Sequence, residues 1–274
     1  MKMKSKYFLF GFLLVFCSYS CRNKTTFEDV VKHVFEEDTL SIDRSLHDGF
    51  DINEIDEQGN NLLHHALKPS SSKLIKNPYA MAKFLISKGI NINKINNGGF
   101  ISAQYIVRDS LLLEFFLQMG VETECDSCNA FLIEQALHYY DISKKNVKLI
   151  LDYGNCHKIS CQDLIFNHPD VSLEVIRDLI EKCDSCNIDK PVYNGWNLLH
   201  FAVDANRIGM VKLLLEKGIN LDIKTTKENK SEFTGISYRE GLSALKIAEI
   251  DNNEELIGVL KKHRQKTEEN SDSR

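Results

Sequence analysis

The feature that most constrains this chain is an internal repeat. Residues 59–66 and 195–202 share the pattern Gly-x-Asn-Leu-Leu-His-x-Ala, and an apolar stretch that contains Lys-Gly-Ile-Asn follows each of them, at 81–93 and 210–222. Weaker copies lie between these two. Glycines suited to ending a helix recur at intervals of about 33, a period typical of solenoid proteins. They are Gly89, Gly120, Gly154 and Gly218, and Cys183 occupies the corresponding position between the last two.

Each clear copy has the pattern of two short helices. In the second copy, Val211, Leu214 and Leu215 follow the i, i+3, i+4 spacing of a helix that is buried along one face. Gly218 is expected to end this helix, because glycine adopts the left-handed backbone conformation without strain. One pair of helices cannot bury its own apolar face, so the pairs are expected to stack on one another.

The repeated segments resemble the ankyrin repeat, whose signature is Thr-Pro-Leu-His-x-Ala. Residues 61–64 and 197–200 occupy the signature positions, with Asn-Leu in place of Thr-Pro, and 241–248 resembles a terminal repeat with Lys246 in the histidine position. The resemblance covers roughly residues 27–263. It implies an all-α ankyrin-repeat solenoid of about seven units, each a helix-turn-helix with a finger loop.

The signature histidines, His64 and His200, are predicted to have a structural role. The resemblance places them near helix starts, where an imidazole can bond backbone groups. A metal or catalytic role is not expected, because no cluster of carboxylate, cysteine and histidine accompanies them. No cofactor is expected either.

The region between the two clear copies is also predicted to be helical. Residues 111–117 are apolar enough for a buried helix or a buried strand, and the position of Gly120 at the repeat spacing favours the helix. The segment 68–79 interrupts the period with Pro69 and Pro78, which predicts a surface loop between two helices. The polar residues 264–274 are expected to form a disordered tail.

A second insertion, at 224–240, lengthens the finger loop between the last two units. In ankyrin-repeat proteins this loop borders the concave binding face, and aromatic residues with arginine are typical interface anchors. The alternative is that the long loop has no role beyond connecting two units. Two aromatic residues at the start of the preceding finger extend the same surface, although the tryptophan also suits simple packing. The candidate partner-binding residues are therefore Tyr193, Trp196, Phe233, Tyr238 and Arg239.

Six cysteines in the middle of the chain are predicted to form structural disulfides, because their number is even and residues 1–20 have the pattern of an export signal. They form the close pairs Cys125/Cys128, Cys156/Cys161 and Cys183/Cys186. Disulfides between adjacent fingers are the other possible pairing, and they would join Cys128 to Cys156 or Cys161 to Cys186.

Zinc binding and thiol–disulfide exchange are the alternatives for these cysteines. Cys-Asp-Ser-Cys occurs twice, at 125–128 and 183–186. The two motifs lie two repeats apart, roughly 20 Å at the usual spacing of packed helices, whereas zinc needs every sulfur at about 2.3 Å. The cysteines of neighbouring units, in 125–128 and 156–161, remain possible ligands. Redox use of Cys-x-x-Cys requires a thioredoxin-like context that the sequence does not show.

The N-terminus has the pattern of an export signal. Lysines at positions 2, 4 and 6 precede an apolar run at 7–17 that is too short for a membrane span. Residues 18–21, Ser-Tyr-Ser-Cys, resemble the end of a bacterial lipoprotein signal, which implies cleavage after Ser20, a lipid on Cys21 and a tether at 21–26. Plain cleavage after Ser20 is the alternative. The predicted location is the bacterial cell envelope, as a periplasmic or outer-membrane lipoprotein.

The sequence as a whole predicts a binding protein rather than an enzyme. The formal net charge is −5, so there is no basic footprint for nucleic acid, and the glycines form no phosphate-binding loop. A small-molecule substrate is not expected. We expect an anchored protein that binds another protein. Two alternatives remain: an immunity or inhibitor lipoprotein that blocks a toxin or an enzyme, and a cysteine-based zinc or redox protein.

Overall fold

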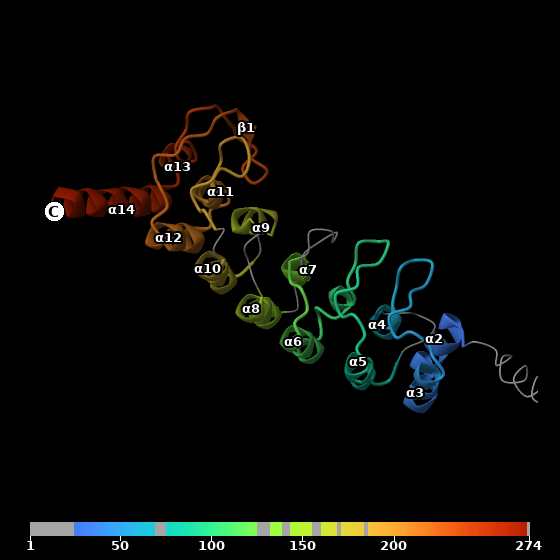
Figure 1. The fold of residues 1–274 in the computed structure, drawn as a ribbon. Helices are drawn as coiled ribbons and strands as arrows, with labels where there is room; N and C mark the ends of the chain where they lie inside the picture. Colours follow the sequence, from blue (N-terminus) through green and yellow to red (C-terminus); the bar gives the residue numbers. More distant parts are fainter. Residues whose placement is uncertain are drawn as a thin grey trace, which may run out of the picture. The chain divides into compact units, whose positions relative to one another are not determined.

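The computed structural model describes residues 25–68, 75–124, 132–138, 143–154, 160–168, 171–183 and 186–272 (Figure 1). The chain divides into two compact units, Met1–Tyr105 and Ile106–Arg274, and each is described by itself. The predicted signal at 1–20, which contains Cys17, lies outside the described residues, and so do four further cysteines, Cys21, Cys125, Cys128 and Cys156.

The first unit contains two pairs of helices. Helix α2 packs on α3, α4 packs on α5, and α4 also contacts α2 on one side and a short 3-10 helix, η1, on the other. The bounds are α2 (Phe27–Glu36), α3 (Thr39–His47), α4 (Leu62–Leu67), α5 (Pro78–Ser87) and η1 (Ser102–Tyr105). The predicted loop at 68–79 follows α4, but α5 begins at Pro78, so the last two residues of that segment are helical. Residues 69–74 lie outside the described part of the chain.

The second unit continues the pattern of paired helices (Figure 1). The bounds are α6 (Ser110–Gln118), α7 (Leu132–His138), α8 (Ser143–Tyr153), α9 (Cys161–Asn167), α10 (Leu173–Lys182), α11 (Leu198–Asp204), α12 (Ile208–Glu216), α13 (Ala244–Ile250) and α14 (Glu254–Asp272). Helices α6, α8, α10, α12 and α14 contact one another in succession, and α9, α11 and α13 form a second row. Helix α6 confirms the helical prediction for 111–117.

The signature histidines connect successive repeats. His64 and His200 each belong to a capping box with Asn61 and Asn197, in which the asparagine oxygen accepts from the histidine backbone N–H. On the far side of each ring, Nε2 bonds the carbonyl oxygen of the next finger, at 3.0 Å from Phe100 and 3.2 Å from Leu242. Both histidines are 1% exposed, and the predicted structural role is confirmed.

The residues that end the helices follow the predicted period, but they act in two ways. Gly218 has φ of +81°, as expected for a glycine after a helix end. Gly154 has no positive φ. A Cβ at Gly154 would lie 2.6 Å from the carbonyl oxygen of Ile150 and 2.6 Å from the hydroxyl oxygen of Thr123. Close approach of neighbouring chain, rather than handedness, therefore requires glycine at Gly154.

Two segments differ from the sequence prediction. Helix α14 continues to Asp272, so the tail expected to be disordered is instead helical over residues 264–272. The segment is rich in lysine, arginine, glutamine and glutamate, which favour helix over coil. The insertion at 224–240 is not a plain loop, since it contains the antiparallel strands β1 (Asn229–Lys230) and β2 (Ser237–Tyr238).

Among the described helices, none has both the length and the apolar character that crossing a membrane requires.

Candidate partner-binding site

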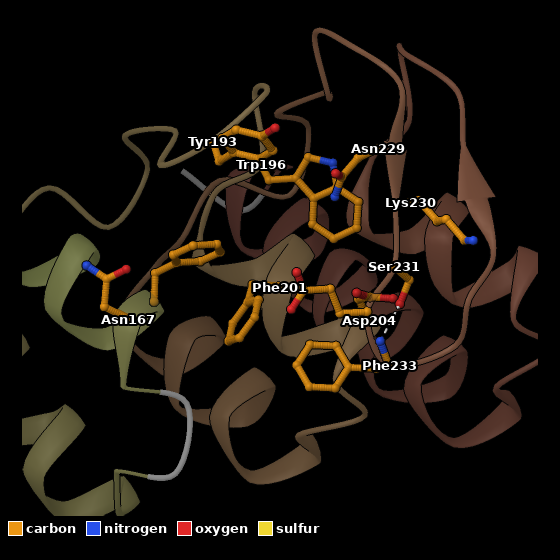
Figure 2. Close-up of a pocket in the computed structure, with 11 residues that line it drawn as sticks. Asn167, Tyr193, Trp196, Phe201, Asp204, Asn229, Lys230, Ser231 and Phe233 are labelled. Atoms are coloured by element: carbon orange, nitrogen blue, oxygen red, sulfur yellow. Dashed lines mark hydrogen bonds between the residues drawn. The ribbon is translucent and has the colours of Figure 1, made fainter. Parts of the chain in front are cut away.

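A pocket of about 370 Å³ opens in the second unit, between the last two finger loops and the helices beside them (Figure 2). Residues from α9, α11, the preceding finger and the β1–β2 hairpin contribute to its wall. The lining residues are Phe166, Asn167, Tyr193, Trp196, Phe201, Asp204, Asn229, Lys230, Ser231, Glu232 and Phe233.

Aromatic rings form much of this wall, with Tyr193 and Trp196 on one side and Phe201 and Phe233 on the other in Figure 2. The ring centroids of Phe166 and Phe201 are 5.1 Å apart, and those of Phe201 and Phe233 are 5.7 Å apart in an edge-to-face arrangement. Tyr193 is 56% exposed and Phe233 is 54% exposed. The rim of the pocket therefore presents two large aromatic side chains to solvent.

The finger that carries Tyr193 is held by backbone hydrogen bonds. The N–H of Val192 donates to the carbonyl of Trp196 at 2.7 Å, and the N–H of Thr226 in the next finger donates to the carbonyl of Asn194 at 2.9 Å. A Cβ at Gly195 would lie 2.4 Å from the Thr226 nitrogen. The glycine of the repeat pattern thus lets two fingers lie against each other, which fixes the position of Tyr193.

The position of Phe233 is set by the turn of the hairpin. The hydroxyl of Ser231 accepts hydrogen bonds from the backbone N–H groups of Phe233, at 3.0 Å, and Thr234, at 2.9 Å. The carbonyl of Ser231 also accepts from the N–H of Gly235 at 3.1 Å. This turn brings the Phe233 ring onto Phe201 of α11 (Figure 2).

Tyr238 is not available to a partner, and this candidate is corrected. Its side chain is 1% exposed, and its hydroxyl donates to Asp251 at 2.6 Å and lies 3.2 Å from Asp204. Burial, followed by the hydrogen bond to Asp251, raises the pKa of Tyr238 well above its usual range. An aromatic residue in a polar loop suggested an exposed contact, but this ring instead anchors the hairpin to α11 and α13.

Trp196 forms part of the pocket wall but is only 3% exposed. Its ring packs between His200, at 5.9 Å, and Tyr238, at 5.7 Å between centroids. The indole Nε1 is buried and has no hydrogen-bond partner in the described part of the chain. Arg239 is exposed but does not line the pocket. Of the five candidates, the structure brings Tyr193, Trp196 and Phe233 together.

Asp204 is a pocket residue that the sequence analysis missed. It lies at the end of α11, is 5% exposed, and lies beside Ser231 in Figure 2. Burial raises the pKa of its carboxyl group, against the hydrogen bonds from Ser231 and Tyr238. An aspartate on an otherwise apolar helix face was the available signal for Asp204. Phe166 and Phe201 were missed as well, because the helical pattern around them predicts only packing.

The described cysteines form disulfides, but not within the close pairs. Cys161, at the start of α9, is bonded to Cys186, with 5.2 Å between their Cα atoms. This is one of the connections between adjacent fingers that the sequence left open, and it replaces the pairs Cys156/Cys161 and Cys183/Cys186. Cys183 is also disulfide-bonded. Within the described ranges, no group of three or more histidine, cysteine, aspartate or glutamate side chains is placed to hold a metal ion.

Comparison with known proteins supports the ankyrin-repeat fold. The ankyrin repeat family model matches residues 194–226. This repeat contains Trp196 of the pocket and the capping box of His200. The ankyrin repeat domain of Bcl-3, described as a unique member of the IkappaB protein family, is 15% identical, with a TM-score of 0.56. The alignment covers 79% of this chain and 92% of that one.

The human ASB11 ankyrin repeat domain is 16% identical, with a TM-score of 0.47, over 79% of this chain and 90% of that one. A search of curated proteins found no match. Together, the helical pairs, the histidine caps and the matched repeat define an all-α ankyrin-repeat solenoid, as the sequence predicted.

Proposed function

We propose that this chain is an exported, membrane-anchored binding module that holds a protein partner at the last two finger loops. Ankyrin repeats generally mediate protein–protein interaction. The observation that carries the proposal is the pocket whose rim exposes Tyr193 and Phe233 over a floor of buried aromatic rings. Exposed aromatic residues around a hollow are typical anchors of protein interfaces.

The rigidity of the site supports this role. The hydrogen bonds across the fingers and the Tyr238 anchor fix both rim residues before any partner arrives. A preformed surface loses little conformational entropy on binding, so more of the contact energy is available as affinity.

Export and anchoring are supported by the sequence and by the cysteines. The basic start and apolar run at 1–17 have the pattern of a signal, and Cys21 would carry the lipid. A disulfide between Cys161 and Cys186 suits an oxidising compartment outside the cytoplasm. Helix α2 begins at Phe27, so a six-residue tether of about 20 Å would hold the repeats close to the membrane.

The binding site is tested by capture of partners from an envelope extract with wild-type protein and with Tyr193→Ala/Phe233→Ala. Truncation of two interface anchors is expected to reduce recovery of the partner at least about 10-fold. Tyr153→Ala is the matched control, because Tyr153 is a 49% exposed aromatic residue on α8 outside the pocket. Equal recovery by the double variant and the control would refute the proposed site.

The anchor is tested by metabolic labelling with radioactive palmitate in a bacterial host. Wild-type protein is expected to incorporate label and sediment with membranes, and Cys21→Ser to do neither. Secretion of unlabelled wild-type protein would show plain cleavage, and protein retained in the cytoplasm would refute export.

A further inference from the structure

The charged groups of the pocket indicate which side chain of a partner it receives. Asp204 and Glu232 both line the pocket. Neither carboxylate has an ion-pair partner within the part of the chain that the structure describes. Asp204 is nine-tenths buried and hydrogen-bonds to the hydroxyl groups of Ser231 and Tyr238, but these neutral groups do not balance a negative charge as a cation would. The two carboxylates of the pocket are therefore suited to binding a positively charged group of a ligand.

The one lysine that lines the pocket does not fill this position. Lys230 is exposed, and Figure 2 shows its ammonium group pointing away from the aromatic rings. Phe201, Phe233 and Trp196 line the same space, and of these Phe233 is the most exposed. Aromatic rings attract cations that lie over their faces. The pocket therefore combines aromatic rings with two carboxylates that have no ion-pair partner among the described residues.

We infer that the pocket receives the guanidinium group of an arginine side chain of the partner, an inference that rests on the proposed function. A planar guanidinium stacks on aromatic rings while its N–H groups reach carboxylate oxygens, whereas a lysine ammonium is a compact and strongly hydrated charge. The volume of about 370 Å³ is near the lower end for ligand pockets, which suits one long side chain rather than a large cofactor.

The roles of the pocket residues follow from their positions. Glu232, exposed at the rim, contacts the arriving cation first. Asp204, at the floor beside Ser231, accepts from the guanidinium once it is seated. Phe233 and Tyr193, which are half exposed at the rim, contact the aliphatic part of the arginine.

The test uses acetylated and amidated peptides of sequence Gly-Gly-X-Gly-Gly, in which X is arginine, citrulline, lysine or phenylalanine. Trp196 is the only tryptophan in the sequence and lines the pocket, so its fluorescence reports binding. The arginine peptide is expected to give a saturable change with Kd on the order of 1 mM. Citrulline has nearly the same shape without the charge, and its peptide is expected to bind about 10-fold more weakly.

Two variants locate the charge that is recognised. Glu232→Gln is expected to weaken the arginine peptide about 5-fold and to leave the citrulline peptide unchanged, because only the charged ligand uses the carboxylate. Glu228→Gln is the matched control, since Glu228 is an exposed glutamate of the same insertion that does not line the pocket. Lys230→Gln is expected to tighten the arginine peptide by removing a nearby positive charge.

Several outcomes would overturn the inference: equal affinity for arginine and citrulline, tighter binding of the phenylalanine or lysine peptide, or no saturable change with arginine. The proposed function fails separately. If Tyr193→Ala/Phe233→Ala loses the partner while Glu232→Gln retains it and arginine and citrulline bind equally, the binding site stands and the arginine assignment falls.

Discussion

Acidification is expected to destabilise the repeat that contains His200. Burial of this imidazole lowers its pKa from the ordinary value of 6.5 to about 4, against the hydrogen bond to the carbonyl of Leu242. The folded chain therefore resists protonation that the unfolded chain accepts. Stability from this group is fully present above pH 6.5 and falls as the pH decreases toward 4.

The magnitude follows from the gap between the two pKa values of His200. Each tenfold preference for the neutral form is worth about 1.4 kcal/mol, so the gap between 6.5 and about 4 amounts to about 3 kcal/mol in full. About 2 kcal/mol of this is lost between pH 7 and pH 5. The raised pKa of Asp204 acts in the opposite direction, because protonation of that carboxyl group favours the folded chain.

The assay is urea unfolding followed by the fluorescence of Trp196, whose ring is 5.9 Å from that of His200. The free energy of unfolding of the wild type is expected to fall between pH 7 and pH 5 by about 2 kcal/mol more than that of His200→Gln. His47→Gln, at a side chain that is 90% exposed, should retain the wild-type pH dependence. Equal losses in wild type and His200→Gln would refute the reasoning.

Three further predictions concern stability measured with the same Trp196 signal. Tyr238→Phe removes a buried donor from Asp251 and Asp204, and it is expected to cost about 1–3 kcal/mol; an unchanged urea midpoint would show that the hairpin is held without this hydroxyl. Gly154→Ala places a Cβ 2.6 Å from a backbone oxygen, and a loss of about 1–3 kcal/mol is expected, whereas a stabilised variant would contradict the close approach. Opening the disulfide of Cys161 and Cys186, 25 residues apart, with Cys161→Ser/Cys186→Ser is expected to cost about 3 kcal/mol, and equal stability of the double variant would argue against the bridge.

Several features of the fold were predictable because they depend on residues close together in the chain. The spacing of Val211, Leu214 and Leu215 is sufficient to predict the buried face of α12. The resemblance to the ankyrin signature predicts a structural histidine, and the structure shows how this works locally, in a capping box that joins residues three apart. Helix α6 was predictable in the same way, because its apolar residues are close together in the chain and Gly120 follows closely after its end.

Other features depended on contacts that no local pattern contains. Asn146 is 1% exposed and donates to the carbonyl of Val107 at 2.7 Å, although these residues are 39 positions apart. The sequence of α8 alone gives no reason to bury an amide. The same holds for the choice between the close cysteine pairs and the Cys161–Cys186 bridge, which depends on where the start of α9 lies relative to the next finger.

The sequence by itself determined that the chain consists of stacked helical pairs with histidine caps, because a hydrophobic period and a helix cap are properties of neighbouring residues. Only the tertiary structure decided that Tyr238 is buried, that Asp204 lines a pocket and that Phe233 lies on Phe201. The reason is that the hairpin of the insertion folds back onto α11. Whether an aromatic residue of that hairpin faces solvent or the core is set by this packing, and not by the polarity of the residues beside it.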